Sequence, residues 1–223
     1  MKKTILSLNC GSSSLKYNVF RINDDLTVTP VLNGNAEEIG NPQRSTMTFK
    51  INGEKNKYPV PLETHEDAIN EMISVFRKNG ITKESICAVG HRIVHGGPVY
   101  TKSTLITDDV KKQIRELFSV APLHNPQNYI GVEEIEKRLP GVPNVAVFDT
   151  AFHGTMGEEA FRYAIPEKWY RNFLIRRYGF HGTSHLYVSK RAAVLLKTPY
   201  NKFTCITAHL GNGSRITKVE TGT

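Results

Sequence analysis

The chain carries two copies of one arrangement, in which an apolar strand enters a glycine-rich turn and leaves as an alternating strand. The first copy spans 4–20 around the turn Gly11–Ser14, and the second spans 203–220 around the turn 210–214. A turn made of one glycine and three serines exposes backbone N–H groups and hydroxyls on a small concave surface, which suits phosphate oxygens. Two such hairpins far apart in the chain predict two related half-domains that face one ligand, as in a duplicated phosphotransferase.

The residues around the first turn have the chemistry of a phosphate and metal site. Ser12 and Ser14 supply hydroxyls, and Lys16 adds a positive charge just past the turn. Asn9, at the end of the first strand, offers a neutral oxygen to a hydrated Mg²⁺. The pattern is not a P-loop, because G-x-x-x-x-G-K-[ST] is absent and a strand follows the turn. Taken alone, an ordinary hairpin with a polar tip is an equally good interpretation, and the second copy favours the phosphate site.

Composition sets the class of protein. The chain has 223 residues, 39% hydrophobic and 22% charged, which is typical of a globular protein with one large or two modest domains. No apolar run approaches the ~20 residues of a membrane span. The net charge of +8 comes from scattered Lys and Arg without a basic run or an RNP pattern, so we expect no nucleic-acid partner. A polyanionic small ligand, or an incomplete chain that lacks acidic segments, explains the charge as well.

Cysteine usage indicates a reducing compartment. Cys10, Cys87 and Cys205 are odd in number, and each lies in or beside a predicted strand. Reduced, buried thiols of a cytosolic protein are the expected state. No C-x-x-C is present, which argues against a structural zinc site.

The opening part of the chain predicts an antiparallel meander followed by a helix. A third strand is expected at 27–32, and strands at 46–51 and 58–60 flank the turn signal Asn52-Gly53. Thr64, with Asp67 three residues on, predicts a helix that begins there and ends at Gly80.

The later part of the chain alternates strands and helices, which indicates an α/β protein. We expect a short strand at 86–89, a helix after Thr107, a helix from 125 to about 139, and a strand at 143–148. Loops around one or two helices follow, and then a helix through Leu196 capped by Thr183 or Ser184. The predicted domains are 1–150, with the first hairpin, and 151–223, which holds the second hairpin and is an incomplete half.

Several single residues stand where ligands bind. Arg92 follows a strand and precedes a Gly-Gly turn, where a guanidinium can grip a carboxylate or phosphate, although a surface ion pair is the alternative. Asp149 follows a predicted strand at the end where α/β proteins place ligands, although a helix cap is the alternative. Val94 and Leu123 are apolar residues beside chain breaks, suited either to a pocket for a methyl group or to the core.

The histidines raise a rival hypothesis. His181 and His185 are four residues apart, as are His91 and His95, and this spacing binds zinc when both lie on one helix. Gly182 interrupts the first pair, and no H-E-x-x-H is present. A metal hydrolase is therefore an alternative, which elemental analysis for zinc would detect.

Five blocks stand out in order along the chain: Asn9–Lys16, His91–Gly97, Phe148–His153, Tyr178–His185 and His209–Gly213. Together they resemble the blocks of the acetate kinase family. Members of that family are longer, so the sequence looks like their N-terminal half or a little more.

The resemblance implies an actin/Hsp70/sugar-kinase-like (ribonuclease H-like) duplicated α/β fold with its second half incomplete. It also implies a cytoplasmic enzyme without membrane contact, a homodimer in its full-length form, that converts acetate and ATP to acetyl phosphate and ADP with Mg²⁺ (or Mn²⁺). The residues that match the family's functional positions are Asn9 for the metal; Lys16, Ser12 and Ser14 for phosphate; Arg92 for the substrate; Val94, Leu123 and Phe180 for the methyl pocket; Asp149, His181 and Arg92 for catalysis; and His209, Leu210, Gly211, Asn212 and Gly213 for the ATP phosphates.

This assignment makes chemical sense. Acetate is ionised at pH 7 and needs no deprotonation, so the barrier is to bring two anions together. Arg92, Lys16 and His181 would lower it by spreading positive charge over the transferring phosphoryl group, and Asp149 would position metal-bound water or substrate.

Two departures from the family pattern limit the expected activity. Arg215 replaces a small residue after the second glycine turn and would perturb that hairpin or contact a phosphate. The family's second catalytic Arg, acidic metal ligand and adenosine pocket have no counterpart before Thr223, so the polypeptide alone is predicted to have little or no kinase activity. Propionate or butyrate kinase, and a non-catalytic nucleotide-binding fragment, are the alternatives.

Overall fold

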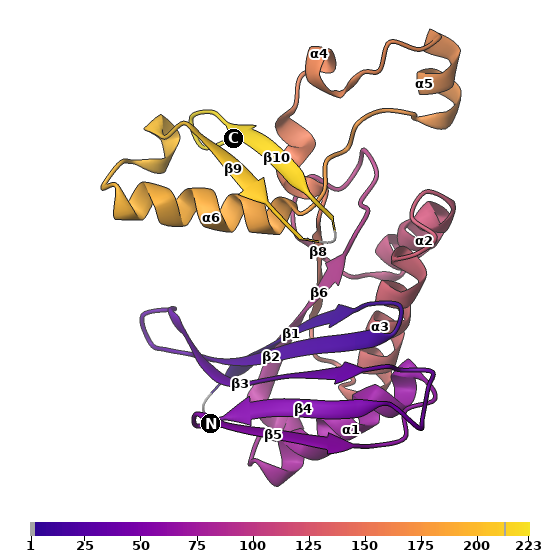
Figure 1. Cartoon of the computed structure of the whole chain (residues 1–223), viewed down its shortest axis with the longest axis vertical. Helices are drawn as coiled ribbons and strands as arrows, with labels where there is room; N and C mark the ends of the chain where they lie inside the picture. The colour runs from indigo at the N-terminus through magenta and orange to yellow at the C-terminus, as the bar shows by residue number, and fades with distance from the viewer. Residues whose placement is uncertain (1–2, 212) are drawn as a thin grey trace. The chain divides into compact units, whose positions relative to one another are not determined.

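The computed structural model describes residues 3–211 and 213–223. The chain divides into two compact units, and Figure 1 labels their elements. Unit 1 is Met1–Ile93 with Thr104–Val147, and unit 2 is Val94–Ser103 with Phe148–Thr223.

Unit 1 is built on an eight-stranded mixed sheet in the order β5-β4-β3-β2-β1-β6-β8-β7. The first five strands form the antiparallel meander expected from the sequence, and β6 then pairs in parallel with β1. The short β7 pairs antiparallel with β8 at the other edge. The strands are β1 (Thr4–Cys10), β2 (Ser14–Ile22), β3 (Val28–Glu37), β4 (Thr46–Ile51), β5 (Glu54–Pro59), β6 (Ile86–Ile93), β7 (Thr104–Leu105) and β8 (Asn144–Phe148).

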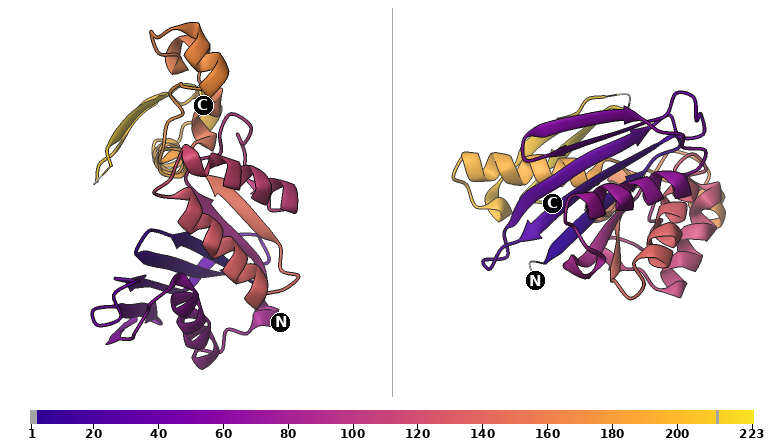
Figure 2. Two further views of the ribbon diagram at one scale, coloured as in Figure 1. Left: turned by 90° about the vertical axis from the view of Figure 1, so that its right-hand side faces the viewer. Right: turned by 90° about the horizontal axis from the view of Figure 1, so that it is seen from below.

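Helices α1 and α3 pack side by side on one face of this sheet, α1 against β2 and α3 against β1 and β6. Figure 2 shows both helices crossing the strands. The apolar face of α1 includes Phe76, whose ring meets Tyr17 of β2 edge-on at 5.7 Å between centroids. Thr64 caps α1 in a capping box with Asp67, as the sequence predicts. The helices of this unit are α1 (His65–Lys78), α2 (Asp108–Glu116) and α3 (Asn125–Arg138), with 3₁₀ turns at Lys83–Ser85 and Leu117–Ser119.

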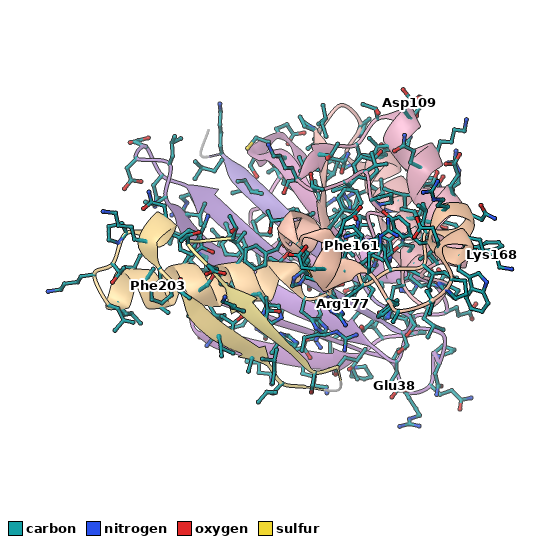
Figure 3. The ribbon with its side chains drawn as sticks, turned by 90° about the horizontal axis from the view of Figure 1, so that it is seen from above. Glu38, Asp109, Phe161, Lys168, Arg177 and Phe203 are labelled. Carbon is teal, nitrogen blue, oxygen red and sulfur yellow. The ribbon has the colours of Figure 1, made fainter. Side chains whose placement is uncertain are left out.

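Unit 2 contains the second hairpin, in which β9 and β10 pair antiparallel as a two-stranded sheet. Helix α6 packs on β9. An irregular segment contains α4 and α5. Phe161 and Arg177 lie side by side at its two ends (Figure 3), where the Arg177 N–H donates to Phe161 O (2.8 Å). The elements are α4 (Glu158–Phe161), α5 (Glu167–Phe173), α6 (Gly182–Leu195), β9 (Cys205–His209) and β10 (Arg215–Val219), with 3₁₀ turns at Ala151–Thr155 and Tyr200–Lys202.

Four predicted boundaries were wrong. The strand expected at 86–89 continues to Ile93, because β6 lies between β1 and β8 and pairing carries it past Gly90, so Arg92 lies within the strand. The strands expected at 27–32 and 58–60 are longer or earlier, at 28–37 and 54–59. Helix α6 is not capped by Thr183 or Ser184, because its first residue is Gly182 and His181 is the N-cap.

Two further findings bear on the class of protein. Over residues 3–211 and 213–223, no helix combines the length and the apolar character that a bilayer crossing requires. All three cysteines are free thiols, and burial raises the pKa of Cys10 to about 12.

Candidate phosphate and catalytic sites

The first glycine turn joins β1 to β2 through a short, tightly bonded loop. The Gly11 N–H donates to Ser14 O (2.8 Å), and the Ile39 N–H donates to Ser13 O (3.0 Å). A side chain at Gly11 would place its Cβ 2.9 Å from Ser14 Oγ, so glycine is needed for the approach of the two strands. Ser12 is exposed and Ser14 is partly exposed.

Two buried side chains that sequence reasoning missed also bind this turn. Asn128 Nδ2 of α3 donates to Cys10 O (2.7 Å), and His65 Nε2 at the start of α1 bonds to Gly11 O (2.7 Å). Because a carbonyl only accepts, the His65 Nε2 must carry the proton. The available signal was a polar Asn within the apolar pattern of a helix, since buried polar groups require partners.

Asn9, Lys16 and Arg92 lie on the three neighbouring strands β1, β2 and β6. Asn9 pairs directly with Lys16, and Asn9 Oδ1 accepts a long hydrogen bond from Arg92 Nη1 (3.4 Å). Cys10 faces α3, so the adjacent Asn9 faces the opposite side of the sheet. The structure therefore gathers two cations and an amide oxygen on the face of the unit 1 sheet that lacks helices.

The neighbour of Arg92 adds no charge to this edge. His91 is buried, and its Nε2 bonds Asn144 Oδ1 (2.8 Å). Burial lowers the pKa of His91 to about 4, an effect that the Asn144 bond only partly offsets. His91 is therefore neutral at pH 7. Leu123, the remaining site candidate of unit 1, is 74% exposed at the surface.

In unit 2, the end of β8 is joined directly to the start of α6. Asp149, which is 2% exposed, follows β8, and its carbonyl accepts the Gly182 N–H (2.9 Å). A Cβ at position 182 would lie 2.4 Å from that oxygen, so only glycine permits the contact. The two sequence blocks that contain Asp149 and His181 are thus held together by one backbone hydrogen bond.

The His181 side chain lies against the second hairpin. It adopts the left-handed conformation (φ 57°), which is uncommon for a residue with a side chain and is typical of functional positions. Its ring stacks on that of His209 with 4.0 Å between centroids and 12° between planes. A Cβ at Gly213 would lie 3.1 Å from His181 Cε1, so the turn runs close over the ring. His209 Nδ1 in turn bonds Ser184 Oγ (3.0 Å).

Two more histidines lie behind this pair, and their roles were missed. His185 is fully buried, with Nδ1 bonded to Thr207 Oγ1 (2.7 Å), and His153 Nε2 bonds Phe180 O (3.0 Å). Burial, followed by the neighbouring imidazoles, lowers the pKa of His185 to about 4, and burial lowers that of His153. Both are neutral at pH 7, so they support His181 without adding positive charge. The sequence feature that could have identified them is that they lie in the same blocks as Asp149 and His181.

The remaining candidates of unit 2 differ in exposure. Val94 is buried, and Phe180 is partly exposed with its ring 5.8 Å from that of His95. Arg215 holds its guanidinium 5.9 Å from the Phe180 ring. Leu210 and Gly211 are exposed in the turn. Asn212 lies outside the described residues.

The described residues fit a nucleotide and a hydrated divalent ion better than a ligand-rich metal centre. Across residues 3–211 and 213–223, no group of three or more His, Cys, Asp or Glu side chains is arranged to hold a metal. Mg²⁺ usually keeps several waters and binds one or two protein oxygens plus phosphate, which is compatible with the single amide oxygen of Asn9. The exposed serine turn beside Lys16 fits the phosphates of a nucleotide.

Solved structures establish the class. The acetate kinase of Porphyromonas gingivalis matches with a TM-score of 0.89 and 42% identity, covering 99% of this chain and 55% of that one. A propionate kinase of Francisella tularensis matches with a TM-score of 0.90 and 40% identity over the same shares. The chain is an α/β protein with the fold of these kinases, the actin/Hsp70/sugar-kinase-like type expected from the sequence.

Sequence comparison establishes the family. The profile of the Acetokinase family matches residues 4–223. The acetate kinase of Macrococcus caseolyticus is 45% identical over 222 residues, which are 99% of this chain and 55% of the relative. That of Staphylococcus saprophyticus is 45% identical over 224 residues, covering 100% of this chain and 55% of the relative. The chain belongs to the Acetokinase family, and it spans about half the length of these curated relatives.

Proposed function

We propose that this chain supplies the acetate-binding and phosphate-binding part of an acetate kinase, which transfers a phosphoryl group from ATP to acetate. The observation that carries the proposal is the family match over residues 4–223, within which every block of candidate site residues falls. The grouping of Asn9, Lys16 and Arg92 in unit 1, and of His181, His209 and Gly213 in unit 2, supports it.

Each candidate residue has a role in this reaction. Arg92 binds the acetate carboxylate, and Lys16 with the Ser12 and Ser14 hydroxyls binds phosphate oxygens. His181 donates to the transferring phosphoryl group as its charge spreads, and Asp149 orients water or substrate. Val94, Leu123 and Phe180 would contact the methyl group. The turn from His209 to Gly213, including Leu210, Gly211 and Asn212, would hold ATP phosphates.

Asn9 would hold the Mg²⁺ (or Mn²⁺) through its amide oxygen. The ion, when bound, supplies charge neutralisation to the phosphates. We also propose that the full-length form is a cytoplasmic homodimer, and that this chain has domains at 1–150 and 151–223. These assignments follow from membership of the family.

The kinase proposal is tested by completing the chain. We expect purified 223-residue protein to form little or no acetyl phosphate, trapped as hydroxamate, because it spans about 55% of its relatives. Fusion to the remaining C-terminal part of the Macrococcus caseolyticus enzyme should restore turnover, and the Arg92→Ala fusion is the matched control. A folded fusion that binds Mg²⁺·ATP but makes no acetyl phosphate would contradict the assignment and favour a nucleotide-binding module.

Propionate is the second candidate substrate. The propionate kinase structure is as similar to this chain as the acetate kinase structure, with TM-scores of 0.90 and 0.89. A methylene in an apolar pocket changes specificity by about 10-fold to 200-fold. Comparing kcat/KM for acetate, propionate and butyrate on the fusion ranks the substrates.

A further inference from the structure

We infer that His65 and Asn128 are positioning residues for the first phosphate turn, and that they act by fixing the peptide planes of Cys10–Gly11 and Gly11–Ser12. The inference rests on the proposed function of this turn as a phosphate site. Both side chains lie in unit 1 with the turn, and neither matches a position assigned to substrate, metal or nucleotide.

Four carbonyl groups at the turn are bound by donors of the same unit. The oxygens of Cys10, Gly11, Ser13 and Ser14 each accept a hydrogen bond from within unit 1. The Ser13 and Ser14 oxygens are bound by backbone N–H groups, whereas those of Cys10 and Gly11 are bound by side chains. Carbonyl oxygens repel a phosphate, and a hydrogen bond from the protein offsets part of that repulsion and turns the oxygen toward its donor.

Fixing a carbonyl also fixes the next N–H, because the peptide unit is planar and trans, with the two groups pointing in opposite directions. His65 holds Gly11 O, and the Ser12 N–H is therefore aimed away from the start of α1. Asn128 holds Cys10 O, which aims the Gly11 N–H at Ser14 O, 2.8 Å away. His65 thus orients the Ser12 N–H as a donor for the ligand, and Asn128 stabilises the hydrogen bond that closes the turn.

The fold restricts the positions of both side chains. His65 is the first residue of α1, directly after the Thr64 capping box that fixes the helix start. Asn128 lies one helical turn before Gly131, whose missing side chain brings α3 against β1, since a Cβ there would lie 2.4 Å from Cys10 Sγ. His65 and Asn128 are both buried.

The test uses the 223-residue chain, isotope-labelled, in four variants. His65→Phe and Asn128→Leu remove the donors, and His65→Gln restores an N–H donor. Gln127→Leu is the matched control, because Gln127 is the partly exposed neighbour of Asn128 on the same helix. Nuclear magnetic resonance follows the Gly11 and Ser12 amide signals, and the affinity for Mg²⁺·ATP is measured on the same variants of the fusion with the C-terminal part of the Macrococcus caseolyticus enzyme.

We expect His65→Phe to shift the Ser12 amide signal, and Asn128→Leu to speed hydrogen exchange at Gly11. Each should raise the Kd for Mg²⁺·ATP about tenfold, the effect of losing one well-placed hydrogen bond. His65→Gln should recover most of the affinity, and Gln127→Leu should change it by less than about twofold.

The outcomes separate the two proposals. If the unmodified fusion fails to bind Mg²⁺·ATP, the proposed nucleotide function of the turn is wrong, while the Gly11 and Ser12 signals of the 223-residue chain still decide the positioning role. If those signals and the Kd in His65→Phe match the control, the positioning role is overturned. Should Asn128→Leu not fold, His65→Phe and His65→Gln decide the matter.

Discussion

The two glycine hairpins share a sequence pattern but receive very different support from their units. The β1–β2 hairpin lies in the middle of an eight-stranded sheet and has α1 and α3 behind it. The β9–β10 hairpin is a whole two-stranded sheet with α6 on β9. The apolar side chains Ile206 and Ile216 of the second hairpin are exposed, at 75% and 73%. An isolated two-stranded sheet is only marginally stable, so the shared sequence pattern does not by itself determine how rigid each hairpin is.

The largest expected effect comes from truncating one apolar side chain in the first strand of each hairpin, β1 or β9. Leu8→Ala should lower the free energy of unfolding by about 2–5 kcal/mol, because Leu8 is 2% exposed in the core. Ile206→Ala should change it by no more than about 0.5 kcal/mol, since that side chain is already in water. Urea denaturation followed by circular dichroism measures both. Equal losses would show that the second hairpin is buried in solution, and the contrast would fail.

The sequence predicts the hairpins well because their information is local. Alternation in β1 and β2, the Gly11–Ser14 turn and the Thr64 capping box are read from neighbouring residues, and the structure confirms them. The continuation of β6 to Ile93 depends instead on its two flanking strands. Gly90 therefore misled a prediction that looked only along the chain.

The site divides in the same way. Asn9, Lys16 and Arg92 were found as chemical types next to strand ends, and β1, β2 and β6 place them together. His65 and Asn128 were missed because they act on backbone carbonyls 54 and 118 residues away, which no local pattern records. Likewise, the stacking of His181 on His209 depends on where α6 begins.

The second test asks whether acid weakens unit 1 through one buried histidine. The pKa of His91 is about 4 in the folded chain, below the ordinary value of 6.5, because burial disfavours the cation. Between these values the unfolded state binds more protons, so stability is full above pH 6.5 and falls as the pH drops toward 4, by up to about 3 kcal/mol. Urea unfolding at several pH values measures the slope.

The control for this experiment is His91→Gln, which keeps a side-chain donor for Asn144 Oδ1 but does not titrate. Its stability should vary less with pH over the same interval. Trp169, the single tryptophan, lies in unit 2, so its fluorescence reports the unfolding of that unit separately. This separation is needed because the pKa of His185 in unit 2 is lowered in a similar way. An unchanged slope in His91→Gln would contradict the role of His91 and direct attention to other groups.

The smallest expected effects come from two glycines, Gly131 on α3 behind the first hairpin and Gly211 in the second turn, and they compare how closely each position is packed. Gly131→Ala would place a Cβ 2.4 Å from Cys10 Sγ, so α3 must move from β1, at a cost of about 1–3 kcal/mol. In Gly211→Ala the new Cβ would meet nothing nearer than Gly213 O at 3.8 Å, an ordinary contact. We expect that change to leave the stability within about 0.5 kcal/mol, measured by urea denaturation. A larger loss in Gly211→Ala than in Gly131→Ala would mean that the second turn is more closely packed than the contact between α3 and β1. The support that distinguishes the hairpins would then lie in their own turns rather than in the helices behind β1.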